Sequence, residues 1–294
     1  MFNPPGGVGG YGSVSMTTRV ALLGAGGKMG CRITDRLKDN ARYDVRYVEP
    51  SEEGRERLAE RGVSAVDESQ ALDGAEIVVM AVPDDLIGPI SEDIVPKIDS
   101  GTMVVLLDPA AAYADALSER DDISYFITHP AHPSIIDASS DLSREDPDWF
   151  GGQGREEQDI VCALHQGPDE DYERGEALAR DIYAPVRRAH ELTTEQMFLL
   201  EPALVEMVLG SCLYAVREAY DHVVEQGVPE QAARDFLFGH FRVELGIVFG
   251  FTDFPFSDGA QAIIDETEED IFRSDWKDRV FSEEKLEEVA SEVA

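Results

Sequence analysis

Short apolar runs alternate with segments of helical spacing over the first two thirds of the chain. The run at 76–82 is nearly continuous in apolar residues, which is typical of a strand buried on both faces of a parallel sheet. The alternation predicts helices that connect parallel strands. We expect strands at or near 20–23, 43–48, 76–82, 102–107, 123–127, 159–165 and 185–190.

The pattern changes beyond residue 190, where long helices replace the alternation. Thr193 and Gln196 form a capping-box signature that opens a helix running to about Gln226. Pro202 lies near the start of this helix and predicts a kink there. The helices of this region carry more apolar surface than one small domain buries, which predicts a homodimer.

Three regions follow from this pattern. Residues 1–18, rich in glycine, are expected to be a disordered tail. Residues 19–190 predict an α/β fold, a Rossmann-type doubly wound parallel sheet that binds a dinucleotide. Residues 191–294 are expected to form an all-helical C-terminal domain for substrate binding and dimerisation. Within the first domain, the acidic, turn-rich stretch 137–158 predicts a loop that either covers the site or is a solvated insertion.

The charge balance narrows the functional classes. The chain has 60 acidic and 25 basic residues, a formal net charge of −35. This charge excludes nucleic acid and anionic membranes as partners through a general electrostatic surface. The acids are dispersed and only five bases are lysine, a composition that suits molar salt, where repulsion is screened within about 3 Å. We therefore favour a halophilic protein over an acidic mesophilic one.

Cysteine usage and hydropathy indicate the compartment. Cys31, Cys162 and Cys212 lie far apart in apolar contexts and predict reduced core thiols rather than disulfides or zinc ligands. No apolar run reaches the ~18 residues of a spanning helix, and no signal segment precedes the first strand. The sequence therefore predicts a soluble, cytoplasmic protein with no membrane partner.

A glycine cluster follows the first expected strand. Glycines here let the backbone turn sharply and approach a pyrophosphate, which the amides at the start of the next helix favour. The spacing is imperfect, because Gly30 arrives one residue later than the G-x-G-x-x-G pattern requires. The predicted cofactor-binding residues are Gly24, Gly26, Gly27, Lys28, Met29, Gly30, Glu49, Val82 and Pro83.

Glu49 follows the second expected strand and favours a nucleotide site over an ordinary glycine-rich turn. It stands 19 residues after Gly30, where a carboxylate can bind the adenosine ribose and repel a 2′-phosphate. This favours NAD over NADP as the cofactor. Lys28 and Arg55 could reach a phosphate, which leaves NADP as the alternative.

Two histidines follow the fifth expected strand. Ligands in open α/β sheets bind beyond the carboxyl ends of the strands, which places His129 and His132 at the predicted site. Imidazole titrates near neutral pH and suits acid/base catalysis, which we favour over a role as hydrogen-bonded loop residues. The pair could also ligate a metal, but the sequence places no third ligand, so the metal stays unknown.

These motifs resemble the 6-phosphogluconate and β-hydroxyacid dehydrogenase superfamily. The shared features are Met29-Gly30 in the glycine turn, Ala81-Val82-Pro83 at a strand end and a helical second domain. The segments 128–133, 194–197 and 200–204 are similar to a narrower, phosphogluconate-dehydrogenase-like branch that includes the D-apionate oxidoisomerases. The resemblance implies an NAD-dependent oxidoreductase acting on a sugar acid or small hydroxy acid. In an oxidoisomerase, oxidation is coupled to an isomerisation that a divalent metal can assist.

One departure from the superfamily bears on the mechanism. The larger superfamily uses a lysine early in its first long helix as acid/base, whereas residues 193–226 contain no lysine. We expect hydride transfer from a substrate carbinol to NAD while His129 or His132 takes the hydroxyl proton. Glu195, from the second domain, is expected to close the site.

Other candidates and rival classes stay open. His240 is a further catalytic candidate, and Glu201 either acts in catalysis or satisfies backbone groups near the proline that follows it. A small acidic substrate needs a cation, for which the sequence offers Arg155, Arg217 and Arg242. The rival classes are a ketol-acid-reductoisomerase-like or simple NAD(P)-dependent reductase, and a non-catalytic dinucleotide sensor. The histidine pair argues against the sensor.

Overall fold

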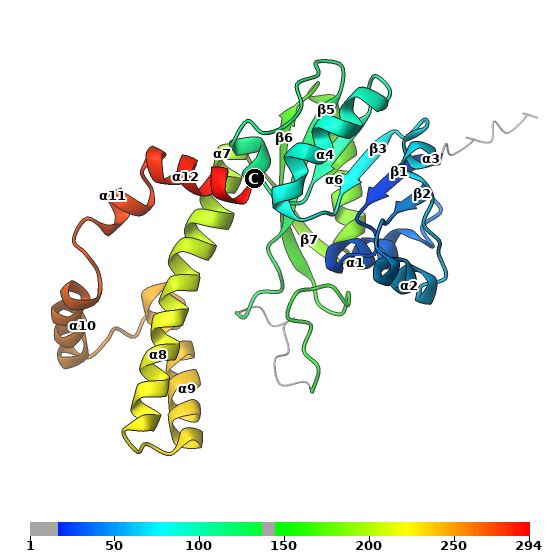
Figure 1. Cartoon of the computed structure of the whole chain (residues 1–294). Coiled ribbons are helices and arrows are strands. Elements are labelled where there is room, and N and C mark those ends of the chain that lie inside the picture. The colour runs from blue at the N-terminus through cyan, green and yellow to red at the C-terminus, as the bar shows by residue number, and fades with distance from the viewer. Residues whose placement is uncertain (1–16, 137–144) are drawn as a thin grey trace, which may run out of the picture. The chain divides into compact units, whose positions relative to one another are not determined.

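The computed structural model describes residues 17–136 and 145–294 (Figure 1). The disordered tail expected over 1–18 falls almost wholly outside these ranges, as does the first part, 137–144, of the loop expected over 137–158.

The chain forms two compact units, one reaching Met197 and including Val293–Ala294, the other comprising Phe198–Glu292. The division lies beyond the expected boundary at residue 190. The physical reason is that Met197 is buried in the hydrophobic core of the first unit.

Seven strands form one sheet in the first unit, in the order β2-β1-β3-β4-β5-β6-β7. Neighbours from β2 to β5 are parallel, β6 is antiparallel to β5, and β7 is parallel to β6. The described part of the connection from β5 to β6 contains no helix, so the chain reverses there instead of crossing over. The strands are β1 (Thr18–Leu23), β2 (Tyr43–Val48), β3 (Ile77–Met80), β4 (Met103–Leu106), β5 (Ser124–Pro130), β6 (Gln158–Gln166) and β7 (Val186–Glu191).

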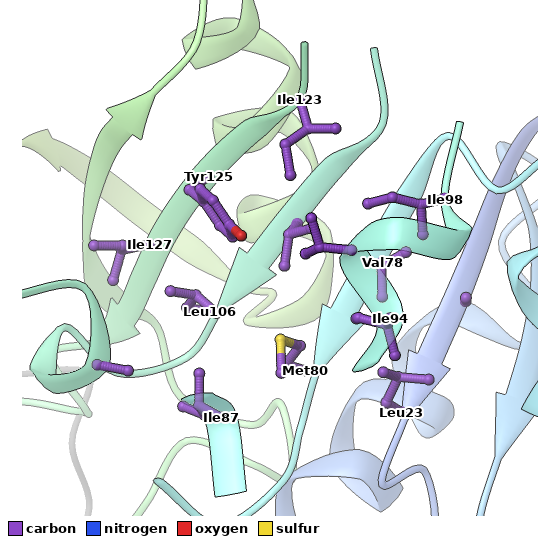
Figure 2. Close-up of a cluster of buried hydrophobic side chains, with 14 of the residues drawn as sticks. Leu23, Val78, Met80, Ile87, Ile94, Ile98, Leu106, Ile123, Tyr125 and Ile127 are labelled. Carbon is purple, nitrogen blue, oxygen red and sulfur yellow. The ribbon is translucent and has the colours of Figure 1, made fainter. Parts of the chain in front are cut away.

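Helices lie on both faces of this sheet, which confirms the doubly wound prediction. Alternate side chains of each strand point to opposite faces, so Val20 and Leu22 enter one core while Ala21 and Leu23 enter the other. Figure 2 shows the second core, where strand residues such as Met80 meet helix residues of α4. The helical elements of this unit are α1 (Lys28–Leu37), α2 (Glu52–Glu60), α3 (Glu68–Leu72), η1 (Asp84–Leu86), α4 (Ile87–Ile94), η2 (Val95–Lys97), α5 (Ala110–Tyr113) and α6 (Glu170–Ile182).

The chain after β7 is helical, as expected. The predicted capping box is confirmed, because the Gln196 N–H donates to the Thr193 hydroxyl at 3.2 Å and the Thr193 N–H donates to the Gln196 side chain at 3.0 Å. Pro202 lacks the N–H of an α-helical turn, and the backbone around it takes the wider π-helical form. The elements are α7 (Thr194–Phe198), the π-helix η3 (Leu199–Gly210), α8 (Ser211–Glu225), α9 (Glu230–Val248), α10 (Asp258–Ile271), α11 (Trp276–Val280) and α12 (Glu283–Val293).

The second unit exposes many large apolar side chains. Phe236 and Phe238 of α9 and Leu213 of α8 are among them. The stretch Thr194–Glu225 is long and apolar enough to cross a membrane by length and composition, contrary to the expectation of no such stretch. One helix of this kind is weak evidence for a membrane, because buried helices of soluble proteins pass the same test.

Candidate functional site

The glycine turn between β1 and α1 depends on close backbone contacts. Gly24 has a φ of +70°, a conformation that disfavours side chains, and a Cβ there would clash with the carbonyl of Ala81. A Cβ at Gly30 would clash with the Gly24 carbonyl and lie 2.7 Å from the Ala25 Cα. Gly30 therefore lets α1 pack against the turn, which accounts for a glycine at this position.

Glu49 ties the end of β2 to this turn. Its carboxylate accepts hydrogen bonds from the Gly26 N–H at 2.9 Å and from the Ser51 N–H and hydroxyl at 2.9 and 2.6 Å. Burial opposes ionisation, but these hydrogen bonds and the charge of Arg57 outweigh it and hold the pKa of Glu49 below its ordinary value. Gly54 leaves room for the side chain, since a Cβ there would lie 2.6 Å from the Glu49 Cγ.

A cavity of about 850 Å³ opens at the carboxyl ends of β1, β2 and β3. A cavity of this size suits a cofactor or another small molecule. It brings together three places that the sequence connects with a cofactor, the glycine turn, the acid after β2 and the end of β3. Its lining includes Gly24, Gly27, Glu49, Ser51, Arg55, Val82 and Pro83.

The rim of this cavity carries a cation as well as the acid. The Arg55 guanidinium donates to the carbonyls of Glu49 and Pro50 at 3.1 and 2.8 Å. Within residues 17–136 and 145–294 it forms no ion pair. The cavity therefore offers an acceptor for a ribose hydroxyl and a cation for a 2′-phosphate.

His129, near the end of β5, and His132, two residues beyond that end, have ring centroids 5.9 Å apart in an edge-to-face contact. His132 has a φ of +60°, which is uncommon for a residue other than glycine. The Nδ1 atoms lie 3.0 Å from the Pro130 carbonyl for His129 and 3.1 Å from the Phe150 carbonyl for His132. A carbonyl only accepts hydrogen bonds, so Nδ1 is the donor and Nε2 the basic nitrogen of each neutral ring.

Two aspartates that follow neighbouring strands, Asp84 after β3 and Asp108 after β4, lie near His129. A carboxylate oxygen of Asp108 and a ring nitrogen of His129 lie within 4.8 Å of one another. Burial lowers the pKa of His129. The hydrogen bond to the Pro130 carbonyl and the charge of Asp84 raise it, but their effect is smaller than that of burial. Burial also raises the pKa of Asp84, and this effect is larger than the lowering caused by the charge of His129. His129 is therefore neutral at neutral pH and stabilised by carboxylates once protonated, as a general base requires.

The structure separates Glu195 from the histidine pair. Thr194, the residue before Glu195, has its hydroxyl 3.0 Å from the Nδ1 of His165, and Glu195 acts electrostatically on that ring. His129 of β5 pairs with Val161 of β6, and His165 lies four residues further along β6. Glu195, which lies near His165, is therefore not beside the histidine pair. His240 belongs to the second unit, where its ring stacks on Phe236 with centroids 4.0 Å apart.

Sequence reasoning missed several residues of this site. Asp84 and Asp108 each follow a buried strand, and that position is a signal that could have identified them. Ser51 was detectable as the N-cap of α2, where its hydroxyl accepts from the Gly54 N–H. Phe150 carries no local signal, because its place beside His132 depends on the fold of the loop before β6.

Two family models match the chain. One, described as "Phosphogluconate dehydrogenase (decarboxylating) C-term", matches residues 139–294. The other, described as "NADP oxidoreductase coenzyme F420-dependent", matches residues 19–120. Together they correspond to the helical part and to the dinucleotide-binding part of the resemblance drawn from the motifs.

Characterised relatives match over almost their whole length. The D-apionate oxidoisomerase of Rhizobium rhizogenes is 47% identical over 88% of this chain and 94% of its own length. That of Cupriavidus necator is 43% identical over 93% of this chain and 98% of its own length.

Solved structures of similar fold include a protein of high sequence identity and a more distant one. A semialdehyde dehydrogenase NAD-binding protein from C. necator, in complex with calcium and NAD, is 42% identical, with a TM-score of 0.89 over 95% of this chain and 100% of that one. A ketol-acid reductoisomerase from an uncultured archaeon, 17% identical over 93% of this chain and 83% of its own, shares the fold with a TM-score of 0.66. The chain therefore belongs to the D-apionate oxidoisomerase family, a group of oxidoreductases that use a nicotinamide dinucleotide, within the phosphogluconate-dehydrogenase-like proteins.

Proposed function

We propose that this protein oxidises D-apionate, or a closely related branched sugar acid, with NAD and couples the oxidation to an isomerisation. The observation that carries the proposal is 47% identity to a D-apionate oxidoisomerase over 94% of that relative. The dinucleotide-sized cavity beside the glycine turn and the histidine pair at the end of β5 are consistent with such chemistry.

His129 is the proposed general base. A nicotinamide bound in the cavity would accept the C–H hydrogen of a carbinol as hydride, and the Nε2 of His129 would take the O–H proton, which would leave a carbonyl and the reduced cofactor. Burial keeps the imidazole neutral before the reaction, and the charge of Asp84 stabilises the imidazolium after it. His132 is the alternative base, and His240 stays a further catalytic candidate.

NAD is the proposed cofactor and NADP the less favoured one. Glu49 is ionised at neutral pH because its pKa is held down, and a carboxylate at the ribose end of the cavity repels a 2′-phosphate. The related structure from C. necator contains NAD, which supports the same choice. Arg55 is the residue that favours NADP, so the comparison of the two cofactors in one assay is informative.

The test is product analysis by NMR after incubation with D-apionate and NAD in molar KCl. The proposal expects stoichiometric NADH and a product with a rearranged carbon skeleton. A simple dehydrogenase or reductase would give an unrearranged carbonyl compound, and a sensor would bind NADH without turnover of any sugar acid. A parallel sample with EDTA shows whether the isomerisation depends on a divalent cation.

The proposed setting of this enzyme is the cytoplasm of a halophile, as a homodimer with a small acidic substrate and neither nucleic acid nor membrane as partner. The charge of −35 and the scarcity of lysine support the saline setting. A second copy of the chain is the proposed cover for the apolar side chains that α8, α9 and α10 expose.

A further inference from the structure

The loop before β6 brings one aromatic ring between the histidine pair and the start of α1. The Phe150 ring lies 5.8 Å from the His132 ring, in an edge-to-face arrangement. The same ring lies under the Lys28 ammonium at 4.6 Å and under the Arg32 guanidinium at 5.1 Å. Phe150 is therefore in contact with His132, the alternative base beside His129, and with the helix that follows the glycine turn.

Phe150 holds His132 through two separate contacts. One is the ring contact, and the other is the hydrogen bond from His132 Nδ1 to the Phe150 carbonyl at 3.1 Å. A backbone φ of +60° is unfavourable for His132 and persists only where the surroundings fix it. Phe150 supplies such surroundings.

Phe150 also fixes the charge of Lys28 without neutralising it. A cation over an aromatic face gains about 0.5–2 kcal/mol. Lys28 forms no ion pair in the part of the chain that the structure describes, although the sequence has 60 acidic residues. The ring therefore holds the ammonium at the start of α1, where it can attract a phosphate.

The backbone around Phe150 is anchored on both sides. The buried Asp148 carboxylate accepts from the Gln153 N–H at 3.0 Å. The Gly152 carbonyl accepts from Arg36 of α1 at 3.4 Å. The Gly151 N–H donates to the Asp148 carbonyl at 3.1 Å, which closes a turn around Phe150. The ring is thus presented by a constrained turn.

We propose that Phe150 is a positioning residue that sets the orientation of His132 and the place of the Lys28 ammonium together, so that the pair formed by His129 and His132 and the cofactor turn are aligned by one side chain. The proposal rests on the proposed function for the role of His132, whereas the Lys28 part concerns cofactor binding alone.

Three variants test this proposal. Phe150→Leu removes the ring, Phe150→Tyr keeps it, and Trp149→Leu is the matched control, an exposed aromatic residue one position earlier on the same turn. The readouts are NADH affinity by fluorescence titration, kcat and KM for D-apionate, the pH profile of kcat, and thermal unfolding.

Phe150→Leu should weaken NADH binding roughly 3- to 30-fold, as expected for the loss of a cation–π contact, and should also lower kcat and shift its pH profile. Phe150→Tyr should restore all three values to within about twofold, and Trp149→Leu should match the wild type. Wild-type behaviour of Phe150→Leu, or failure of Phe150→Tyr to rescue it, overturns the proposal.

The proposed function can fail separately. If no sugar acid is turned over, the activity assignment is wrong, while NADH affinity still tests the contact between Phe150 and Lys28. Unchanged affinity in Phe150→Leu would then reject the inference by itself.

Discussion

The Glu49 carboxylate accepts a hydrogen bond from the Gly26 N–H at 2.9 Å, which joins the acid after β2 to the glycine turn after β1. The acid is thus part of the structure that shapes the turn as well as a candidate for contact with the ribose. Its other oxygen is held by Ser51, so the side chain is oriented before any cofactor arrives.

Glu49→Gln should weaken both the turn and the cofactor site. An amide offers one acceptor oxygen, so either the Gly26 N–H or the Ser51 N–H would face an NH₂ group, at a cost of about 1–3 kcal/mol. We expect a lower free energy of unfolding and weaker NADH binding by fluorescence titration. Glu56→Gln, an exposed acid of the nearby helix α2, is the control and should change neither value. A wild-type free energy of unfolding and wild-type NADH affinity in Glu49→Gln would contradict the role of Glu49 in joining the end of β2 to the glycine turn.

The activity should show an acid limb that belongs to His129. Its pKa is lowered from an ordinary value near 6.5, so the neutral base is fully present above about pH 6.5 and is lost as the pH falls through the lowered pKa. The charge of Asp84 opposes this lowering, so Asp84→Asn should move the limb to still lower pH. The profile of kcat/KM between pH 4.5 and 8 measures both, and a shift to higher pH in Asp84→Asn would contradict the assignment.

Stability should depend on salt because of the net charge of −35. The Debye length is about 10 Å in 0.1 M salt and about 3 Å in 1 M salt, so repulsion between dispersed carboxylates is strong in the first and weak in the second. We expect the melting temperature to rise steeply between 0.1 and 3 M KCl. Equal melting temperatures across this range would reject the halophilic interpretation.

The chain should be a dimer in high salt. Light scattering coupled to size exclusion in 3 M KCl should give twice the chain mass of 32.4 kDa. Leu213→Glu places a charge among the exposed apolar side chains of α8 and should shift the mass towards that of one chain, while Glu218→Gln should not. A wild-type mass of one chain would refute the homodimer.

Local patterns were sufficient to predict much of the fold. The strand at Tyr43–Val48 occupies its predicted range, because its length and flanking turns are encoded in neighbouring residues. The capping box was predictable for the same reason, because it joins Thr193 to Gln196, three residues later. The reversal of β6 was not predictable in the same way, since an apolar run carries no information on strand direction.

The candidate site was less accessible to sequence reasoning. The glycine turn and the histidine pair are contiguous motifs, so their chemistry is visible in order along the chain. Asp84 approaches His129 only because β3, β4 and β5 are neighbours in the sheet, and strand order is a tertiary property. The position of Glu195 also depends on the tertiary fold. It was expected to close the site but lies near His165.

The central claim is NAD-dependent oxidation with His129 as the base, and NADH formation at 340 nm in molar KCl tests it most directly. With D-apionate and NAD, the wild type should form NADH, and His129→Asn should lower kcat by about 10²–10⁴-fold while NADH binding is retained. Absence of turnover with any sugar acid and either cofactor, or full turnover by His129→Asn, would contradict the account.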